Sequence, residues 1–498
     1  MPIDIEEPYS PGWWLNRLNQ KLVERRKTYV DLFDRYEGNS PIPPSLRNAP
    51  ESAQKFFRTA RTNFAEMVVK AVRYPLRIQA VATSVERAST GDVAAWQLMR
   101  SSGMTGELSA VHRNALVTGR AYGMVGWHPQ WGPRFTSEDP REVITIQDPT
   151  VQAETIAAMK ITHDNVADRD VAWLYLPGRV YRCSRRAGLS PSLPRWSAAA
   201  FEWDAEAGGA EGMPLPAPFE DTIPIIPYRN EEGIGEFERH RDIFDRIDHL
   251  ILQGMTIATY QAFRQRAIKA DQRDLPEYHP DTGEKIDYEA VFSADPGVLW
   301  RLPKTAEMWE SGAVDLTPVW TGVDKDIQRL SAVTFTPLAM FSPEGQNQSA
   351  EGAAFAREAR TFKIEDRHDL FGESHARALS LLLALNGDFD RADPSGIRII
   401  WRPGERYSLS AKAAAMAHTR GDLPFRTRAI DIWQASPEEA DEMEQLREDE
   451  MLQALMGEAA SGAISADDGM PTPDADRPGA LEPSIPTAEA PPEPFDTR

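Results

Sequence analysis

The sequence predicts an α+β fold of several domains, and three observations support this prediction. The chain has 498 residues, enough for about two to four domains of ordinary size. Apolar residues recur at helical spacing over long segments, most clearly in 236–268 and 350–385. Residues 121–228 instead contain short runs of strand-like alternation separated by turn residues.

Composition excludes several broad classes of protein. The chain has 55 Lys and Arg against 76 Asp and Glu, a net charge of −21, so it is not a basic nucleic-acid binder overall. Its single Cys, Cys183, excludes an internal disulfide framework and a cysteine-based zinc site, and we interpret it as an ordinary half-buried thiol. The longest near-continuous apolar run, 379–385, is too short to span a bilayer, and residues 1–10 lack a signal-peptide pattern. We therefore expect a soluble protein of a reducing compartment.

Charge is distributed unevenly along the chain. Residues 1–130 carry 17 Lys and Arg against 12 Asp and Glu, whereas residues 421–498 have a net charge of −14. The last residues, 461–498, contain eight Pro and eight acids but few apolar side chains, so we predict a disordered acidic tail. A solubilising role for this tail is favoured over a docking role.

The first 235 residues are expected to form a mixed helical and β region. Helices are predicted at 13–36, 64–73, 93–99 and 107–118. Strands are predicted at 76–81, 121–127, 142–147, 157–163, 171–176, 179–185 and 200–204.

A pair of amphipathic helices with an acidic insert follows. The first, 236–268, has charged residues on one face and would be about 50 Å long at about 1.5 Å per residue. The insert, 271–316, holds eleven acids and four bases, and its apolar pieces at 290–292 and 297–302 suggest a small hairpin. The second helix runs from 317 to about 335.

The remaining elements are mostly helical. A loop at 337–349 leads into a long helix at 350–385, for which Gly372 predicts a bend, and a strand is predicted at 397–401. Helices are predicted at 410–418 and 425–434. Ser436-Pro-Glu-Glu439 is a capping box that opens a last helix to about residue 457.

No motif of nucleotide or metal chemistry supports an enzyme. There is no phosphate-binding loop of the G-x-x-x-x-G-K-[ST] type, and Gly119, Gly123 and Gly126 lie at a helix-to-strand junction, which favours tight packing over dinucleotide binding. Glu365 and His368 form one Glu-x-x-His pair, whereas a di-iron bundle requires two. No carboxylate pair indicates a glycosidase. We expect no enzyme activity, no cofactor and no metal.

The order of these elements resembles that of tailed-bacteriophage portal proteins, of the type found in long-tailed phages of Gram-positive hosts. The segments that carry the resemblance are Asn63-Phe-Ala-Glu-Met-Val-Val-Lys-Ala-Val72 with 76–78, Ile223-Pro-Ile-Ile-Pro-Tyr-Arg-Asn230 with Gly235-Glu-Phe-Glu238, Thr336-Pro-Leu-Ala-Met340 through Ser349, and Leu423-Pro424 with 436–439. Together they cover about residues 10–460.

The resemblance implies a portal-like architecture. Its parts would be the wing (1–235 and 350–424), two stem helices (236–270 and 318–335), the clip (271–317), the tunnel loop (336–349), the helical crown (425–460) and the tail (461–498). It also implies a ring of about twelve copies at one capsid vertex of the virion, assembled in the host cytoplasm. Double-stranded DNA would be packaged and ejected through its channel. The implied partners are terminase, a head-tail adaptor, the major capsid protein and a scaffolding protein, with no membrane.

The same resemblance assigns roles to individual residues. The DNA-facing tunnel loop would present Met340, Phe341, Ser342, Glu344, Gln346, Asn347 and Gln348. Clip docking would use Asp281, Glu284, Asp287 and Glu289. Packing between the stems of neighbouring subunits would use Ile243, Ile247, Leu250, Ile251, Val323, Ile327 and Leu330. The loop contains no Lys or Arg, so it would contact phosphates without strong binding.

Other interpretations stay open at this point. The chain would also fit a capsid-associated scaffolding or interaction protein without a channel, a monomer in which the two stem helices form an ordinary hairpin, or an uncharacterised soluble hydrolase. A basic run in the first domain would contact DNA or capsid protein, although a solvated face is favoured. This run comprises Lys55, Arg58, Arg61, Lys70, Arg73 and Arg77.

Overall fold

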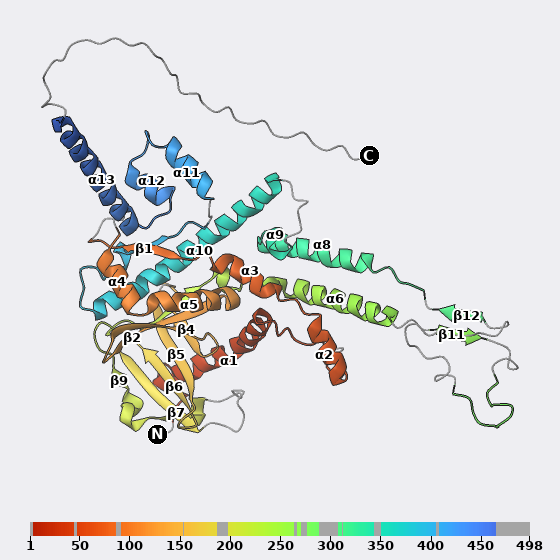
Figure 1. Cartoon of the computed structure of the whole chain (residues 1–498). Coiled ribbons are helices and arrows are strands. Elements are labelled where there is room, and N and C mark those ends of the chain that lie inside the picture. The colour runs from red at the N-terminus through yellow and green to blue at the C-terminus, as the bar shows by residue number, and fades with distance from the viewer. Residues whose placement is uncertain are drawn as a thin grey trace, which may run out of the picture. The chain divides into compact units, whose positions relative to one another are not determined.

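The computed structural model describes residues 3–43, 47–85, 91–152, 154–186, 198–262, 266–269, 276–287, 307–310, 312–342, 350–404 and 408–464. Within them the chain is a mixed helix and strand protein, as predicted (Figure 1). It divides into two units, Met1–Ala440 and Asp441–Arg498. The predicted tail at 461–498 lies outside the described residues from 465 onward; up to Ile464 it is helical.

The predicted N-terminal helices are confirmed, and one further helix is present. They are α1 (Pro11–Tyr36), α2 (Glu51–Thr59), α3 (Phe64–Arg73), α4 (Val93–Ser101) and α5 (Met104–Thr118). Side-chain caps fix three of their starts, because Ser10, Asn63 and Asp92 each accept a backbone N–H three residues onward. The short α2 was not predicted.

Three antiparallel sheets surround these helices. A six-stranded sheet has the order β4-β5-β6-β7-β8, with β9 also paired to β7, and a three-stranded sheet has the order β10-β2-β3. A third sheet pairs β1 with the distant β13. The strands are β1 (Ile78–Ala82), β2 (Arg120–His128), β3 (Gly132–Glu138), β4 (Val143–Gln147), β5 (Thr155–Asp164), β6 (Arg169–Leu176), β7 (Arg179–Arg186), β8 (Glu202–Trp203), β9 (Met213–Pro214), β10 (Ile225–Arg229) and β13 (Arg398–Trp401).

Close packing explains two of the glycines that resembled a dinucleotide motif. Gly119 ends α5 with a φ of +76°, and a Cβ there would lie 2.3 Å from the Gly233 carbonyl oxygen. A Cβ at Gly123 would lie 2.3 Å from the Phe135 ring. The packing interpretation of these two positions is therefore confirmed.

Two antiparallel helices form a long hairpin, α6 (Arg241–Ala262) with α8 (Thr317–Thr334) (Figure 1). The prediction that the first helix extends from 236 to about 268 is wrong. At about 1.5 Å per residue, its 22 residues span about 33 Å. After the helix the backbone forms β11 (Arg266–Lys269), which pairs antiparallel with β12 (Glu307–Glu310) because the returning chain supplies its backbone partners. The hairpin predicted at 290–292 and 297–302 lies outside the described residues.

The C-terminal elements follow the predicted order. They are α9 (Leu338–Phe341), α10 (Ala350–Leu385), α11 (Leu409–His418), α12 (Phe425–Asp431) and α13 (Pro437–Ile464). The capping box is confirmed, because Glu439 N donates to Ser436 Oγ at 3.1 Å and Ser436 N donates to Glu439 Oε2 at 2.8 Å. Helix α10 continues through Gly372 as one element (Figure 1).

A buried carboxylate joins the hairpin to the rest of the first unit. Glu236 precedes α6 and accepts hydrogen bonds from Lys363 Nζ at 2.5 Å and Arg367 Nε at 2.9 Å, both on α10. Burial alone would raise the pKa of Glu236, but the two cations outweigh burial and hold the pKa below its usual value. Lys363 Nζ also donates to the carbonyl of Thr334 at 3.0 Å, at the end of α8. One lysine thus contacts the entry and the exit of the hairpin.

A second set of contacts fixes the start of α6 against α1 and the segment before α3. Arg35 donates to both carboxylate oxygens of Asp245, at 2.6 and 3.2 Å. Asp248 is buried, and its Oδ1 accepts the Thr62 N–H at 3.0 Å. Burial raises the pKa of Asp248 to about 6, and the neighbouring Asp245 adds to this, whereas Arg61 opposes it.

Replacing Asp248 by Asn should stabilise the chain at alkaline but not at acidic pH. The folded state keeps the carboxyl protonated up to about pH 6, whereas the unfolded chain loses this proton near its ordinary value of 3.8. Stability therefore falls as the pH rises through this window and stays reduced above it. We expect Asp248→Asn to raise the free energy of unfolding by about 1–2 kcal/mol at pH 8 and by almost nothing at pH 4.

Urea unfolding of both proteins at the two pH values measures this difference. Asp245→Asn is the matched control, because it removes the charge of one of the two carboxylate partners of Arg35 and should destabilise the chain at pH 8. An Asp248→Asn effect that is the same at pH 4 and pH 8 would contradict the assignment.

Candidate functional site

The apolar stripe of the hairpin is covered within its own chain. Ile247, Val323 and Leu330 are buried in the main hydrophobic core, and Ile243, Leu250, Ile251 and Ile327 are half-buried against it. The two helices and the body of the chain therefore bury or half-bury all seven residues without a neighbouring copy. The proposed packing between subunits through these seven residues is not tested by a single chain.

Charge and a close approach set the register of the two helices. Asp326 of α8 is buried, accepts from Arg246 of α6 at 2.5 Å and from Arg329 at 2.8 Å, and these hydrogen bonds lower its pKa. Farther along α6, a Cβ at Gly254 would lie 3.0 Å from the Trp320 ring. Both contacts require the helices to stay in one register.

Other apolar side chains near the hairpin base are exposed. Phe335 ends α8 with a left-handed φ of +52° and is 55% exposed, and Phe362 of α10 is 61% exposed. Both line a groove of about 510 Å³ together with Val333, which is also exposed. Phe355, about two turns before Phe362 on α10, is 74% exposed. Exposed aromatic side chains gathered in this way are typical of surfaces that contact another protein.

Three of the four predicted clip residues are described, and all three are exposed. Asp281, Glu284 and Asp287 lie in or beside a tight turn in which His279 N donates to the Glu284 carbonyl at 2.8 Å. Glu289 lies outside the described residues. Trp309 of β12 is 59% exposed. The described part of this insert therefore presents carboxylates and apolar side chains to solvent.

The tunnel-loop assignment is only partly covered by the structure. Residues 338–341 form the helical turn α9 instead of a loop, and Phe341 packs edge-on against Phe64 with ring centroids 5.4 Å apart. Phe341 is thus held against the body of its own chain, which makes it a poor candidate for contacting DNA. Met340 and Ser342 are half-buried. The predicted residues Glu344, Gln346, Asn347 and Gln348 lie outside the described residues.

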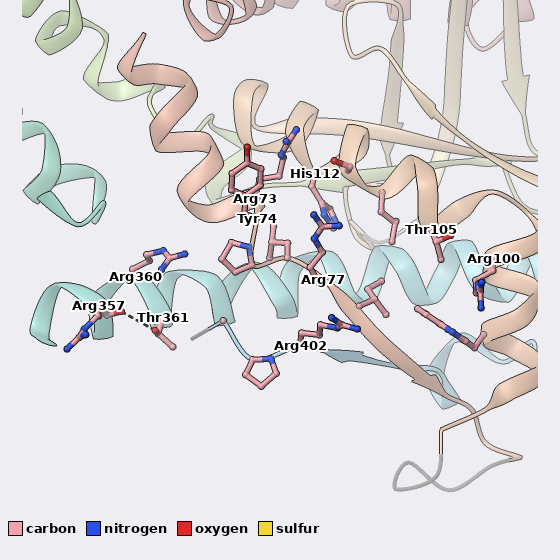
Figure 2. Close-up of a pocket in the computed structure, with 18 residues that line it drawn as sticks. Arg73, Tyr74, Arg77, Arg100, Thr105, His112, Arg357, Arg360, Thr361 and Arg402 are labelled. Carbon is pink, nitrogen blue, oxygen red and sulfur yellow. Dashed lines mark hydrogen bonds between the residues drawn. The ribbon is translucent and has the colours of Figure 1, made fainter. Parts of the chain in front are cut away.

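A cavity of about 880 Å³ lies among α3, β1, α4, α5, α10 and the end of β13, and we call it the basic cavity (Figure 2). Among the described residues, its lining contains six arginines and no Asp, Glu or Lys. They are Arg73, Arg77, Arg100, Arg357, Arg360 and Arg402. Figure 2 shows these six arginines on several elements that border the cavity.

Sequence reasoning identified only two of these arginines, Arg73 and Arg77, as part of a basic run. The spacing of Arg357 and Arg360 places them on neighbouring positions of one helix face, which was a usable signal. Arg402 lies beside them because β13 pairs with β1. The two strands are more than 300 residues apart in the sequence, so no local pattern predicts this contact.

The residues singled out for enzyme chemistry have structural roles. Cys183 is fully buried, and burial raises the pKa of its thiol to about 12. His368 stacks on Trp401 with centroids 4.6 Å apart, and burial lowers its pKa to about 4. Among the described residues, no group of three or more His, Cys, Asp or Glu is placed to hold a metal ion. Likewise, none of the helices in the described ranges combines the length and hydropathy needed to cross a membrane.

Known proteins resemble this chain at the level of family and fold. The family model described as "Phage portal protein, SPP1 Gp6-like" matches residues 15–453. No curated protein matches the chain.

Similar solved structures come from gene transfer agent particles. A chain of the virion of a native particle is 13% identical, with a TM-score of 0.42, and the match covers 77% of this chain and 93% of that chain. A chain from the neck of an empty particle, computed with C6 symmetry, is 12% identical, with a TM-score of 0.44 and coverage of 77% and 93%. One from the neck of the native particle, computed with C12 symmetry, is 12% identical, with a TM-score of 0.41 and coverage of 76% and 93%.

The match to the family model starts within α1, ends within α13 and includes both helices of the hairpin. Because it extends over most of the sequence, the chain belongs to the family of SPP1 Gp6-like phage portal proteins.

Proposed function

We propose that this chain is the subunit of a portal ring of about twelve copies whose hairpin docks other proteins of the DNA-packaging machinery. As a member of the portal family it forms a ring at one vertex of the capsid, and double-stranded DNA passes through the channel of that ring. The observation that carries the finer proposal is the α6–α8 hairpin, which leaves the body as a rigid pair of helices and ends in the β11–β12 sheet and the acidic turn (Figure 1).

In this proposal, residues 1–235 and 350–424 are the wing, α6 and α8 the stem, 271–317 the clip, and 425–460 the crown. The clip binds terminase during packaging and a head-tail adaptor afterwards, and the wing and crown contact the major capsid and scaffolding proteins. Assembly takes place in the host cytoplasm before the ring enters the virion. The chain acts without catalysis, because its work is to guide DNA and to hold partners.

The exposed aromatic groove supports a specific contact between neighbouring copies. Phe335 and Phe362 line it together with charged side chains of both signs, among them Glu232, Arg239 and Asp366. An apolar centre with a charged rim is the usual composition of a protein interface. Since the helices already cover the stripe of Ile247 and Leu330, this groove is the better candidate for the surface between subunits.

Removing the two aromatic rings should weaken ring assembly. We expect Phe335→Ser with Phe362→Ser to shift the chain from rings to smaller species, because hot-spot aromatics often contribute about 2 kcal/mol or more each to an interface. Mass photometry across a range of concentrations measures the distribution. Phe389→Ser is the control, because Phe389 is 70% exposed but lies outside the groove. Equal assembly of the double variant and the control would remove the groove from the interface.

Reversing charge at the acidic turn should impair docking more than folding. Asp281→Lys with Glu284→Lys changes two exposed side chains, so the thermal unfolding midpoint should change little. We expect weaker co-purification with the cognate terminase and adaptor, since complementary charge steers such encounters. The matched control, Glu220→Lys with Asp221→Lys, reverses two exposed carboxylates elsewhere. If Asp281→Lys with Glu284→Lys leaves co-purification with terminase and adaptor unchanged, the clip assignment is contradicted.

The segment after α9 is proposed to contact DNA in the channel. Replacing residues 343–348 by a Gly-Ser segment of the same length should leave rings intact but lower the amount of DNA packaged or retained per particle. Starting after Ser342 keeps the Phe341–Phe64 contact. Gel quantification of DNA from purified particles provides the readout, and wild-type DNA content in the variant would exclude the segment.

Rings too narrow for a duplex would instead favour a scaffolding protein without a channel.

A further inference from the structure

The basic cavity concentrates positive charge, and five of its six arginines have no ion-pair partner in the described part of the chain. Among those residues, no carboxylate forms an ion pair with Arg73, Arg77, Arg100, Arg357 or Arg402. The chain otherwise pairs its arginines readily, as Arg35, Arg185 and Arg367 each bind a carboxylate. The protein as a whole has a net charge of −21. The positive charge of the cavity is therefore opposite in sign to the net charge of the chain.

The fold holds several of these arginines in place. Arg402 N donates to the Arg77 carbonyl at 2.8 Å, which makes the two residues direct cross-strand neighbours at the end of the β1–β13 sheet. Like charges in such positions repel and destabilise a sheet. Arg360 Nε donates to the Ala71 carbonyl at 3.0 Å, and the Arg73 guanidinium lies over the Tyr74 ring. The arrangement has an energetic cost that a bound anion would offset.

The donors that line the cavity match the chemistry of phosphate. Arg presents a planar fork of N–H groups that binds phosphate oxygens in pairs, and the lining adds the hydroxyls of Thr105, Ser109 and Thr361. Tyr74 is 51% exposed and Trp96 half-buried at the same cavity, and both offer aromatic surface to a sugar or base. Hydroxyls and guanidinium groups without carboxylates are typical of contacts to a nucleic-acid backbone.

We propose that the basic cavity is a binding site for the phosphate backbone of nucleic acid, independent of base sequence. Of the segment assigned to the channel, the described residues 336–342 do not line it. The site belongs to a single chain, so it does not require the ring. In the virion it would give packaged DNA a fixed point of attachment on the body of the portal subunit.

The test measures binding of a short random-sequence DNA duplex to the purified full-length chain by fluorescence anisotropy. The triple variant Arg77→Ala, Arg100→Ala, Arg402→Ala should bind at least tenfold more weakly at about 100 mM salt. The dependence of affinity on salt should also become shallower, by about 0.9 in logarithmic slope for each phosphate that the variant no longer binds. The triple Lys variant at the same positions keeps the charge and should retain most of the binding.

The matched control replaces three exposed arginines outside the cavity and outside the basic run, Arg47, Arg169 and Arg420, by Ala and should bind like the wild type. Thermal unfolding midpoints show whether each variant is folded. Equal loss in the cavity and control variants, or no binding by the wild type, would overturn the proposal. Tighter binding of a polyglutamate peptide than of the duplex at the same salt would also overturn it, in favour of an acidic protein segment.

Particle mass, measured on the same samples, separates this proposal from that of the ring. A cavity variant that assembles normally but loses DNA binding supports the site whatever the copy number. A wild-type chain that remains monomeric and still binds DNA through the cavity would contradict the ring and leave the site intact.

Discussion

A buried ion pair network at Glu236 determines how the hairpin meets the body of the subunit. The carboxylate is almost inaccessible to water, and Lys363 and Arg367 of α10 surround it. Removing one partner of such a buried network leaves an uncompensated charge, which costs about 3–5 kcal/mol. Lys363 also donates to the carbonyl of Thr334, the last residue of α8. The network therefore fixes the position of both helices relative to α10. The direction in which the hairpin leaves the body is therefore set by charge and hydrogen-bond geometry, which are more directional than apolar packing.

This attachment changes which surfaces are available for assembly. The hairpin makes its main contacts within its own chain. Its apolar stripe is buried or half-buried, and Asp326 of α8 forms an ion pair with Arg246 of α6. What it offers to a neighbour is the aromatic groove at its base and the exposed side chains of its far end. In the proposed ring, the hairpin would keep its own shape and the groove residues would contact neighbouring copies.

Local patterns predicted most of the elements and failed where distant segments decide the outcome. The caps at Asn63 and Ser436, the close packing at Gly119, and the second hairpin helix follow from signals within a few residues. The early end of α6 depends instead on β12, which lies about forty residues later in the chain. The coverage of the apolar stripe within its own chain was also beyond local patterns, because periodicity shows that a helix has an apolar face but not what covers it. The contact of Phe341 with Phe64 was also beyond local patterns, because the two residues lie far apart in the sequence.

Helix α10 sets the spacing between several parts of the subunit. Along its length it presents Arg357 and Arg360 to the basic cavity, Lys363 and Arg367 to the hairpin, and Ser374 to the carbonyl of Pro227. Each residue turns an α-helix by about 100°, so inserting or deleting one residue in its middle would rotate one set of side chains away from the others at once. A point substitution on α10 alters the contacts of one residue, whereas a change in the length of α10 would alter its contacts with the basic cavity, the hairpin and Pro227 together.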